Sequence, residues 1–302
     1  MRKKLIFSLK LIIGLAIFLY LIYRIGAGDI FSTLSKVNLN YFVLAVLLTF
    51  PGWVIGMINI RLLLKSINAS IGFFKLLKFY LLSWAFGLFI PGKLGEFSLV
   101  YFLQKEDIKI GEGMSVALLD KIISIFSLIL ISVIAGVFFF KHKSILLIIA
   151  LYVFGLVFFL LALLSGRIRR FVVKYILGDF AKKFENFSKT FFYILRKRFF
   201  VVVINLLITL IKWFLFALVI FVLFLSLGIQ VNFFYVFLIT SLIKLVGLIP
   251  ISVNGIGIDE FFSILFYGMI GIIPAVIISL QLMKRIISYS FAVLIFIFLK
   301  WK

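Results

Sequence analysis

The chain has 302 residues, of which 65% are hydrophobic and only 14% are charged. Soluble domains are roughly 45–50% apolar and about 25% charged, so this composition excludes a water-soluble globular protein. The formal net charge of +22 would suit a nucleic-acid-binding protein, but the basic residues gather in short gaps between apolar segments, where such residues orient membrane helices. We therefore expect an all-α, polytopic integral membrane protein with no nucleic-acid partner.

Several kinds of chemistry are absent from the sequence. There is no cysteine, and His142 is the single histidine, which excludes disulfides, thiolate chemistry and a histidine-rich metal site. The sequence also has no P-loop motif for binding nucleotide phosphates. We expect neither a metal nor a cofactor, and we expect that ATP is not a direct energy source.

Six segments are apolar and long enough to cross a membrane, which takes ~20 residues in a helix. They are Leu5–Tyr23, Leu39–Leu64, Gly113–Phe140, Ser144–Ser165, Phe199–Leu227 and Pro274–Leu299. The first follows a basic N-terminus, as a signal peptide would. It is longer than the apolar core of a signal peptide and no small-residue cleavage site follows, so we interpret it as a retained helix.

Two further apolar stretches, Phe73–Leu103 and Asn232–Tyr267, are interrupted by proline, glycine and charged residues. The first interruption reads Ile90-Pro91-Gly92-Lys93-Leu94-Gly95-Glu96. The second reads Ile249-Pro250-Ile251-Ser252-Val253-Asn254-Gly255-Ile256-Gly257-Ile258-Asp259-Glu260. A broken helix at membrane depth persists only where it is buried in protein or lines a polar cavity. We predict two re-entrant or broken helical hairpins; the alternative is an interfacial loop between two helices.

The two halves of the chain share a spacing of charges. Glu96 precedes Lys121 by 25 residues, and Glu260 precedes Arg285 by the same number. One offset of 164 residues relates both pairs and also superposes two of the predicted spans. We predict one transmembrane domain over residues 1–302 that contains two repeats, at about 39–140 and 199–300.

Basic residues also predict the topology, because they accumulate on the cytoplasmic side. They place both termini in the cytoplasm and give the two repeats opposite orientations; Lys141-His142-Lys143 is the exception and falls outside. Inverted repeats with broken helices are an architecture of transporters. We expect a multi-pass protein of the cell membrane.

The longest polar stretch, about residues 166–198, is predicted to be a basic cytoplasmic connector between the repeats. It carries ten lysines and arginines against two acidic residues, and its phenylalanines recur at helical spacing. Part of it can lie as an amphipathic helix on anionic lipid. A solvated linker is the alternative.

Polar residues at the predicted membrane depth are the candidates for binding a substrate. They are Lys93, Glu96, Asp120, Lys121, Lys212, Lys244, Asn254, Asp259, Glu260, Lys284 and Arg285. A lone charge at a helix centre costs ~2.5–3.5 kcal/mol on insertion scales, so we expect these side chains to face one another or a polar cavity.

We expect ion pairs between Glu96 and Lys121 and between Glu260 and Arg285. The remaining cations would bind an anionic ligand, with helix N-termini at the breaks adding N–H donors. Arg285 would be the main phosphate contact, because a guanidinium can bind two oxygens at once. The alternatives are structural: Lys212 extending along Trp213 toward the interface, Lys244 at a helix C-terminus, and helix-terminal or paired roles for the acidic residues.

In these motifs the chain resembles the transmembrane region of lysylphosphatidylglycerol synthases, the flippase-like UPF0104 family. The resemblance rests on Pro91–Glu96, Asp120-Lys121, Pro250–Glu260 and Lys284–Tyr289, and it covers nearly the whole chain. Lys93, Lys121 and Asp259 stand where that family often has arginine. Because the chain ends at Lys302, we expect it to lack the aminoacyl-transferase domain that accompanies this region in multidomain relatives.

The resemblance implies a flippase that moves a lipid with a charged head group between leaflets, and not an enzyme. The lipid would be an aminoacyl-phospholipid or a polyprenyl-phosphate-linked sugar. A lipid-modifying synthase or a glycosyltransferase would be its partner. The alternatives are a non-catalytic membrane partner of a glycosyltransferase and a membrane-embedded lipid-phosphate transferase.

The topology can be tested with single cysteines, placed next to Lys105 and next to Gly271 in separate variants. We expect a membrane-impermeant thiol reagent to label the second in intact cells and the first only after lysis, because the basic residues place these positions on opposite sides. The natural chain has no cysteine and is the unlabelled control. Labelling of both positions from the same side would rule out inverted repeats.

Overall fold

The structure is a computed structural model that describes residues 2–90, 95–139, 186–249 and 251–299, with the single positions 150 and 155. Within these ranges all regular secondary structure is helical. The chain forms two compact units. Unit 1 consists of Met1–Met57, Phe73–Ser98 and Ile211–Lys302, and unit 2 of Ile58–Gly72 and Leu99–Leu210.

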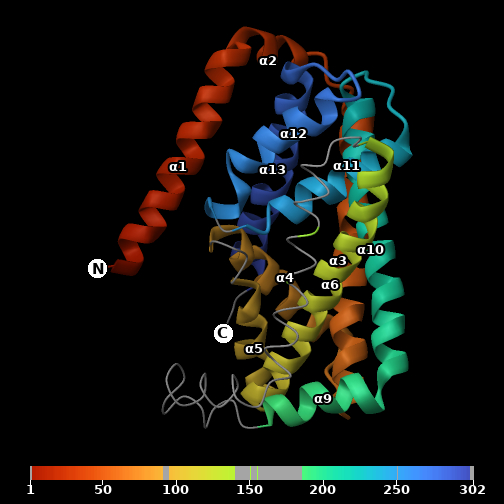
Figure 1. The fold of residues 1–302 in the computed structure, drawn as a ribbon. Coiled ribbons are helices and arrows are strands. Elements are labelled where there is room, and N and C mark those ends of the chain that lie inside the picture. Colours follow the sequence, from red (N-terminus) through yellow and green to blue (C-terminus); the bar gives the residue numbers. More distant parts are fainter. Residues whose placement is uncertain are drawn as a thin grey trace. The chain divides into compact units, whose positions relative to one another are not determined.

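Figure 1 labels the helices. They are α1 (Arg2–Ile25), α2 (Ala27–Leu34), α3 (Leu39–Ser66), α4 (Phe73–Phe89), α5 (Ser98–Gln104), α6 (Ile110–Phe139), α9 (Phe187–Lys197), α10 (Phe199–Ser226), α11 (Phe233–Val246), α12 (Ile258–Gly268) and α13 (Pro274–Phe298), with a 3₁₀ turn η4 (Val253–Gly255) before α12. In the part of the chain that the structure describes, α1, α3, α6, α10 and α13 are long and apolar enough to cross a membrane. The protein is therefore an all-α polytopic membrane protein.

The predicted spans agree with these five helices to within one helical turn at each end. The predicted span Ser144–Ser165 lies outside the described residues. The inverted relation of the two repeats remains a prediction.

Both predicted interruptions separate two helices. Helix α4 ends at Phe89 and α5 begins at Ser98, and α11 ends at Val246 before α12 begins at Ile258. At the second interruption Asn254 has φ 48°, and the glycines on either side of Ile256 also have positive φ. L-residues rarely adopt this left-handed conformation, so these positions end one helix and redirect the chain into the next. Whether the hairpins are re-entrant or interfacial remains a prediction.

Helix α1 packs on the second interruption through a close contact between backbones. Gly14 is the buried residue in the described part of a helix that is otherwise half-buried or exposed. A Cβ atom at Gly14 would lie 2.7 Å from the carbonyl oxygen of Ile256 and 3.0 Å from the Cβ of Ser252. A Cβ atom at Gly257 would in turn meet the carbonyl oxygen of Gly14. Small residues thus let two membrane segments approach closely, as is typical of helix packing in lipid.

Aromatic side chains hold α13 against α3 and α4 in unit 1. Trp53 of α3 lies edge-on to Phe291 of α13 and to Trp84 of α4, with ring centroids 4.9 Å apart in both pairs. Phe50, one turn before Trp53, contacts Phe291 at 5.2 Å. Such pairs each contribute about 0.5–1.5 kcal/mol beyond the burial of their area. They fix the helix that carries the candidate cations Lys284 and Arg285.

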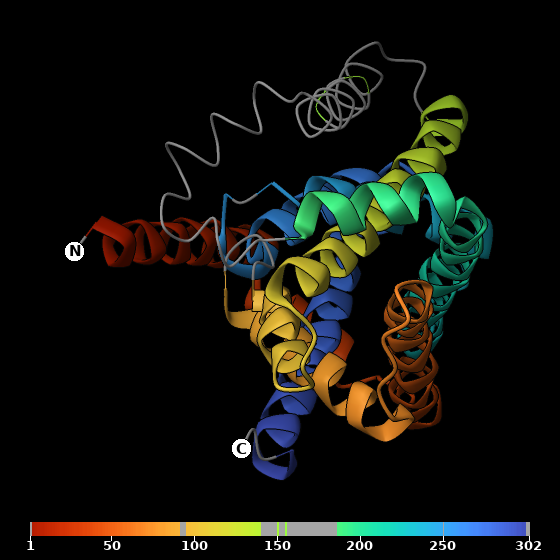
Figure 2. The ribbon, with the colours of Figure 1, turned by 90° about the horizontal axis from the view of Figure 1, so that it is seen from below.

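In unit 2, α9 lies across α6 (Figure 2), and the Ser115 hydroxyl of α6 donates a 2.8 Å hydrogen bond to the carbonyl of Phe187. Helix α9 buries Thr190, Phe191 and Ile194 and exposes its basic side chains, among them Lys189, Arg196 and Lys197. This part of the predicted basic connector is therefore an amphipathic helix. The remainder, residues 166–185, lies outside the described residues.

From the close contact between α1 and the second interruption we predict the effect of adding one methyl group at Gly14. Gly14→Ala should lower the free energy of unfolding by about 1–3 kcal/mol, as overpacking does, because a backbone carbonyl occupies the space that the new Cβ needs. Gly52→Ala in α3 is the matched control, since no atom lies within 4 Å of its Cβ position and alanine favours a helix. Thermal unfolding in detergent measures both variants; equal stability of the two would contradict the packing described.

Candidate functional site

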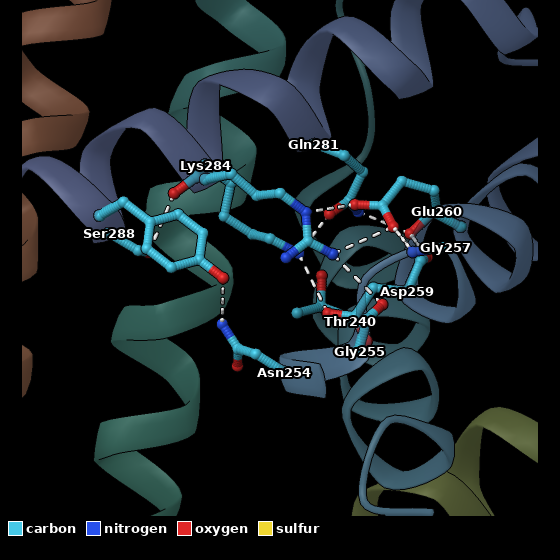
Figure 3. Close-up of polar contacts among 12 residues, drawn as sticks. Thr240, Asn254, Gly255, Gly257, Asp259, Glu260, Gln281, Lys284 and Ser288 are labelled. Atoms are coloured by element: carbon cyan, nitrogen blue, oxygen red, sulfur yellow. Dashed lines mark hydrogen bonds and ion pairs between the residues drawn. The ribbon is translucent and has the colours of Figure 1, made fainter. Parts of the chain in front are cut away.

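Two adjacent acidic residues in the first turn of α12 face two adjacent basic residues of α13 (Figure 3). Asp259 pairs with Lys284, and Glu260 pairs with Arg285. All four side chains belong to unit 1 and are largely buried; the side chain of Glu260 is 0% exposed and that of Arg285 12%. The ion pair predicted between Glu260 and Arg285 is thus present, together with a second pair beside it.

The pair of Glu260 and Arg285 holds the interrupted backbone together. The Arg285 Nε donates to Glu260 Oε1 at 2.6 Å, and its Nη2 donates both to Glu260 Oε2 at 3.0 Å and to the carbonyl oxygen of Gly255 at 3.2 Å. Glu260 Oε2 also accepts from the backbone N–H of Gly257, 2.7 Å away, at the start of α12. One carboxylate therefore satisfies both a guanidinium and a free helix-end donor, which are costly to bury unpaired.

The pair of Asp259 and Lys284 belongs to a chain of polar contacts that borders a pocket. Lys284 Nζ lies 3.4 Å from Asp259 Oδ2 and also donates to the side-chain oxygen of Gln281, one turn earlier on α13. The Gln281 side-chain amide donates to the hydroxyl of Ser263 at 2.6 Å. An ammonium has three N–H donors, and these two contacts use two of them.

Glycines on both arms of the interruption make room for the Asp259 carboxylate. A Cβ atom at Gly247, just after α11, would lie 2.7 Å from Asp259 Oδ1, and a Cβ atom at Gly255 would meet the same oxygen. Gly247 has ordinary helical φ and ψ, so its lack of a side chain serves the close approach rather than the backbone conformation. The acid is held where it reaches Lys284.

A pocket lies beside Lys284, between helices α10, α11, α12 and α13. Its lining residues are Phe216, Ile220, Thr240, Ile243, Lys244, Tyr267, Gln281 and Lys284, and the space between them is small, enough for about one water molecule. The hydroxyls of Thr240 and Tyr267 lie 2.7 Å apart. Lys244 Nζ lies 4.6 Å from the ring centroid of Phe216. The lining carries two ammonium groups, two hydroxyls and an amide but no carboxylate, which suits an anionic ligand.

The other predicted site residues are distributed over both units. Asn254 donates its side-chain amide to the Tyr289 hydroxyl at 3.3 Å, and Lys212 lies over the ring of Trp213 at 5.4 Å. Glu96 lies against Gly87 of α4 in unit 1, since a Cβ there would lie 2.6 Å from its Cγ.

Asp120 and Lys121 lie on α6 in unit 2. Because Glu96 and Lys121 belong to different units, their predicted pairing remains a prediction. Lys93 lies outside the described residues.

Sequence reasoning missed Thr240, Ser263, Tyr267 and Gln281. Gln281 had a recognisable pattern, since it is a lone amide in an apolar helix, one turn before Lys284 and Arg285. The hydroxyl residues had none, because serine and threonine are common in membrane helices for packing reasons and tyrosine is common at membrane interfaces.

The polar groups of this site can bind an anion. Among the residues that the structure describes, no group of three or more His, Cys, Asp or Glu could hold a metal ion. The pocket offers cationic and hydroxyl donors, which recognise the oxygens of phosphate or carboxylate.

Removing one partner of the buried pair should show its structural part. Arg285→Ala should destabilise the protein by about 3–5 kcal/mol, because the Glu260 carboxylate stays buried without its counter-charge. Adding Glu260→Gln should recover much of that loss, since the amide oxygen can still accept from Gly257. Thermal unfolding in detergent tests this, with Arg24→Ala at the exposed end of α1 as the control. An Arg285→Ala protein as stable as the control would refute the role.

Comparison with known proteins agrees with the motifs on which the site is built. The family model for the lysylphosphatidylglycerol synthase TM region matches residues 7–295. A UPF0104 membrane protein of Methanocaldococcus jannaschii is 24% identical over 306 aligned positions, which cover 93% of this chain and 90% of the relative. Since the family match spans both interruptions and all the candidate charges, this chain belongs to the lysylphosphatidylglycerol synthase transmembrane family.

Proposed function

We propose that this protein is a flippase, which moves a lipid with an anionic or phosphate-containing head group between the leaflets of the cell membrane. The observation that carries the proposal is the cluster of four largely buried charges where the interrupted α11–α12 segment meets the membrane span α13. Charges inside membrane proteins are costly and typically mark substrate or ion pathways.

The cluster suits transport because it combines rigid and accessible parts. The pair of Glu260 and Arg285 supports the backbone of the interruption, and Lys284 reaches the adjacent pocket. A polar head group would enter this region while the acyl or prenyl chains stay in lipid. Transporters place their substrate sites at interrupted helices in the same way.

Membership of the family supports the choice of lipid. The family's name refers to synthases of an aminoacylated phospholipid, so an aminoacyl-phospholipid is the first candidate and a polyprenyl-phosphate-linked sugar the second. A lipid-modifying synthase or a glycosyltransferase would supply such a lipid and would be a natural partner. The protein itself would make and break no bond, and both of its termini would be cytoplasmic.

Reconstitution into liposomes tests the proposal. With acyl-labelled fluorescent phosphatidylglycerol in both leaflets, purified protein should make the inner-leaflet label accessible to an impermeant quencher faster than in protein-free vesicles. The double variant Lys284→Gln with Asp259→Asn removes the charges without stranding either partner. It should slow exchange by roughly tenfold or more, the effect of losing a hydrogen bond to a charged group.

The control for this experiment is Lys36→Gln, which removes an exposed lysine of unit 1 far along the chain from the site. It should exchange lipid as the natural protein does. Exchange no faster than in protein-free vesicles would refute the flippase, and the appearance of a chemically altered lipid would identify an enzyme instead.

A further inference from the structure

We propose that α9 and the arginine that follows it, Arg198, bind the head groups of anionic phospholipids at the membrane surface. This surface lies wholly in unit 2, so the proposal is independent of the flippase, whose evidence lies in unit 1. The bound lipid belongs to the surrounding bilayer and is not the transported substrate. The sequence predicts either a lipid anchor or a solvated linker for this segment, and the geometry of α9 favours the anchor.

Helix α9 lies at the level where the chain enters the membrane. It ends at Lys197, and the membrane span α10 begins at Phe199, so Arg198 alone separates the two helices (Figure 1). Phe199 and Phe200, the first two side chains of α10, are 64% and 74% exposed, and exposed apolar side chains of a membrane span are solvated by lipid. The basic end of α9 is therefore next to the first side chains that contact acyl chains, which is the level of the head groups.

The apolar side of α9 is occupied by protein and does not insert into lipid. Thr190, Phe191 and Ile194 are buried, and the carbonyl oxygen of Phe187 accepts a hydrogen bond from Ser115 of α6. An amphipathic helix on its own binds a membrane by burying its apolar side at the boundary of the acyl chains. Here α6 takes the place of the lipid, so α9 contacts lipid through its polar side, and this contact is electrostatic.

The polar side of α9 is basic. Lys189 and Arg196 lie two turns apart and are exposed, and Lys197 and Arg198 add two exposed charges at the end of the helix. Between Asn186 and Arg198 the sequence has these four basic residues and no acidic one. Within the described ranges no carboxylate forms an ion pair with any of the four. Lipid phosphates can supply the missing negative charge.

Stabilisation of the helix itself explains only part of this pattern. Arg196 and Lys197 lie in the last turn of α9, where positive charge interacts favourably with the helix dipole. Lys189 lies in the first turn, where positive charge is unfavourable for the same reason. A negatively charged partner outside the helix accounts for all three positions.

Aromatic side chains orient the two arginines for binding phosphate. The guanidinium carbon of Arg196 lies 5.6 Å from the ring centroid of Phe192, and that of Arg198 lies 5.9 Å from the ring centroid of Tyr193. A cation–π contact occupies the face of a guanidinium and leaves the N–H groups along its edge for two phosphate oxygens. The basic surface favours anionic lipid over phosphatidylcholine, because the choline of the latter is a cation next to the phosphate.

Site-directed quenching in bilayers tests the proposal on the full chain. The natural protein has no cysteine, so Phe200→Cys places a single fluorophore two residues after Arg198. The labelled protein is reconstituted into phosphatidylcholine vesicles with a small fraction of nitroxide-labelled phosphatidylglycerol or, separately, of nitroxide-labelled phosphatidylcholine. We expect the anionic quencher to be locally enriched roughly fivefold or more over the zwitterionic one, since one basic residue near an anionic surface contributes about that factor.

Two variants that lose the same charge locate the binding surface. The first carries Lys189→Gln, Arg196→Gln and Lys197→Gln, and its enrichment of the anionic quencher should be roughly threefold lower or less than that. The second is the matched control, with three exposed positions of unit 2 outside α9: Lys65→Gln, Lys105→Gln and Lys109→Gln. It should keep most of the enrichment. Glutamine is a good helix former, and thermal unfolding confirms that both variants are folded.

Salt separates attraction between charges from insertion of an apolar surface. Raising the salt concentration from about 0.1 M to about 1 M shortens the Debye length from ~10 Å to ~3 Å, so the enrichment should fall towards one. Three results would overturn the proposal: equal quenching by the two lipids in the natural protein, an equal loss of enrichment in the two variants, or an enrichment that salt does not change.

Discussion

The free-energy cost of burying unpaired charge inside a membrane protein determines how the helices that carry these charges pack in unit 1. Glu260, which is fully buried, forms an ion pair with Arg285 of the neighbouring helix. The residues directly before them, Asp259 and Lys284, form a second ion pair. Breaking such a pair strands a charge in a low-dielectric environment. The four residues therefore fix how α12 lies against α13, and the interruption before α12 is stable because its free backbone groups are included in the same network.

Glycine residues also make this network possible. The interruption brings two backbone segments and a carboxylate into a space where side chains would collide: Gly247 and Gly255 accommodate Asp259, and Gly14 and Gly257 bring α1 onto the same segment. Polar contacts determine which charged residues pair. The absence of Cβ atoms lets the backbone segments and the carboxylate approach closely. The motif between Pro250 and Glu260 is thus rich in glycine for packing reasons as well as for its positive φ angles.

The two ion pairs differ in how many contacts hold the basic side chain. Arg285 binds its acid through two nitrogens and the backbone through one of them, which suits a rigid support. Lys284 contacts its acid through a single longer interaction and lies at the edge of a pocket, which suits exchange with a ligand. Adjacent residues on one helix can thus divide support and binding between them, because a rotation of about 100° per residue turns them toward different neighbours.

The sequence by itself determined the helical membrane class, the spans that the structure describes, both interruptions and the partner of Glu260. Apolar length, proline and glycine positions, and the spacing of rare charges are local properties, and lipid allows few solutions for them. Only the tertiary structure decided that Lys284 shares a pocket with Thr240 and Tyr267, and that Gly14 supports the second interruption. These contacts join residues far apart in the chain, and they depend on helix crossing and side-chain direction, which leave no periodic pattern along the sequence.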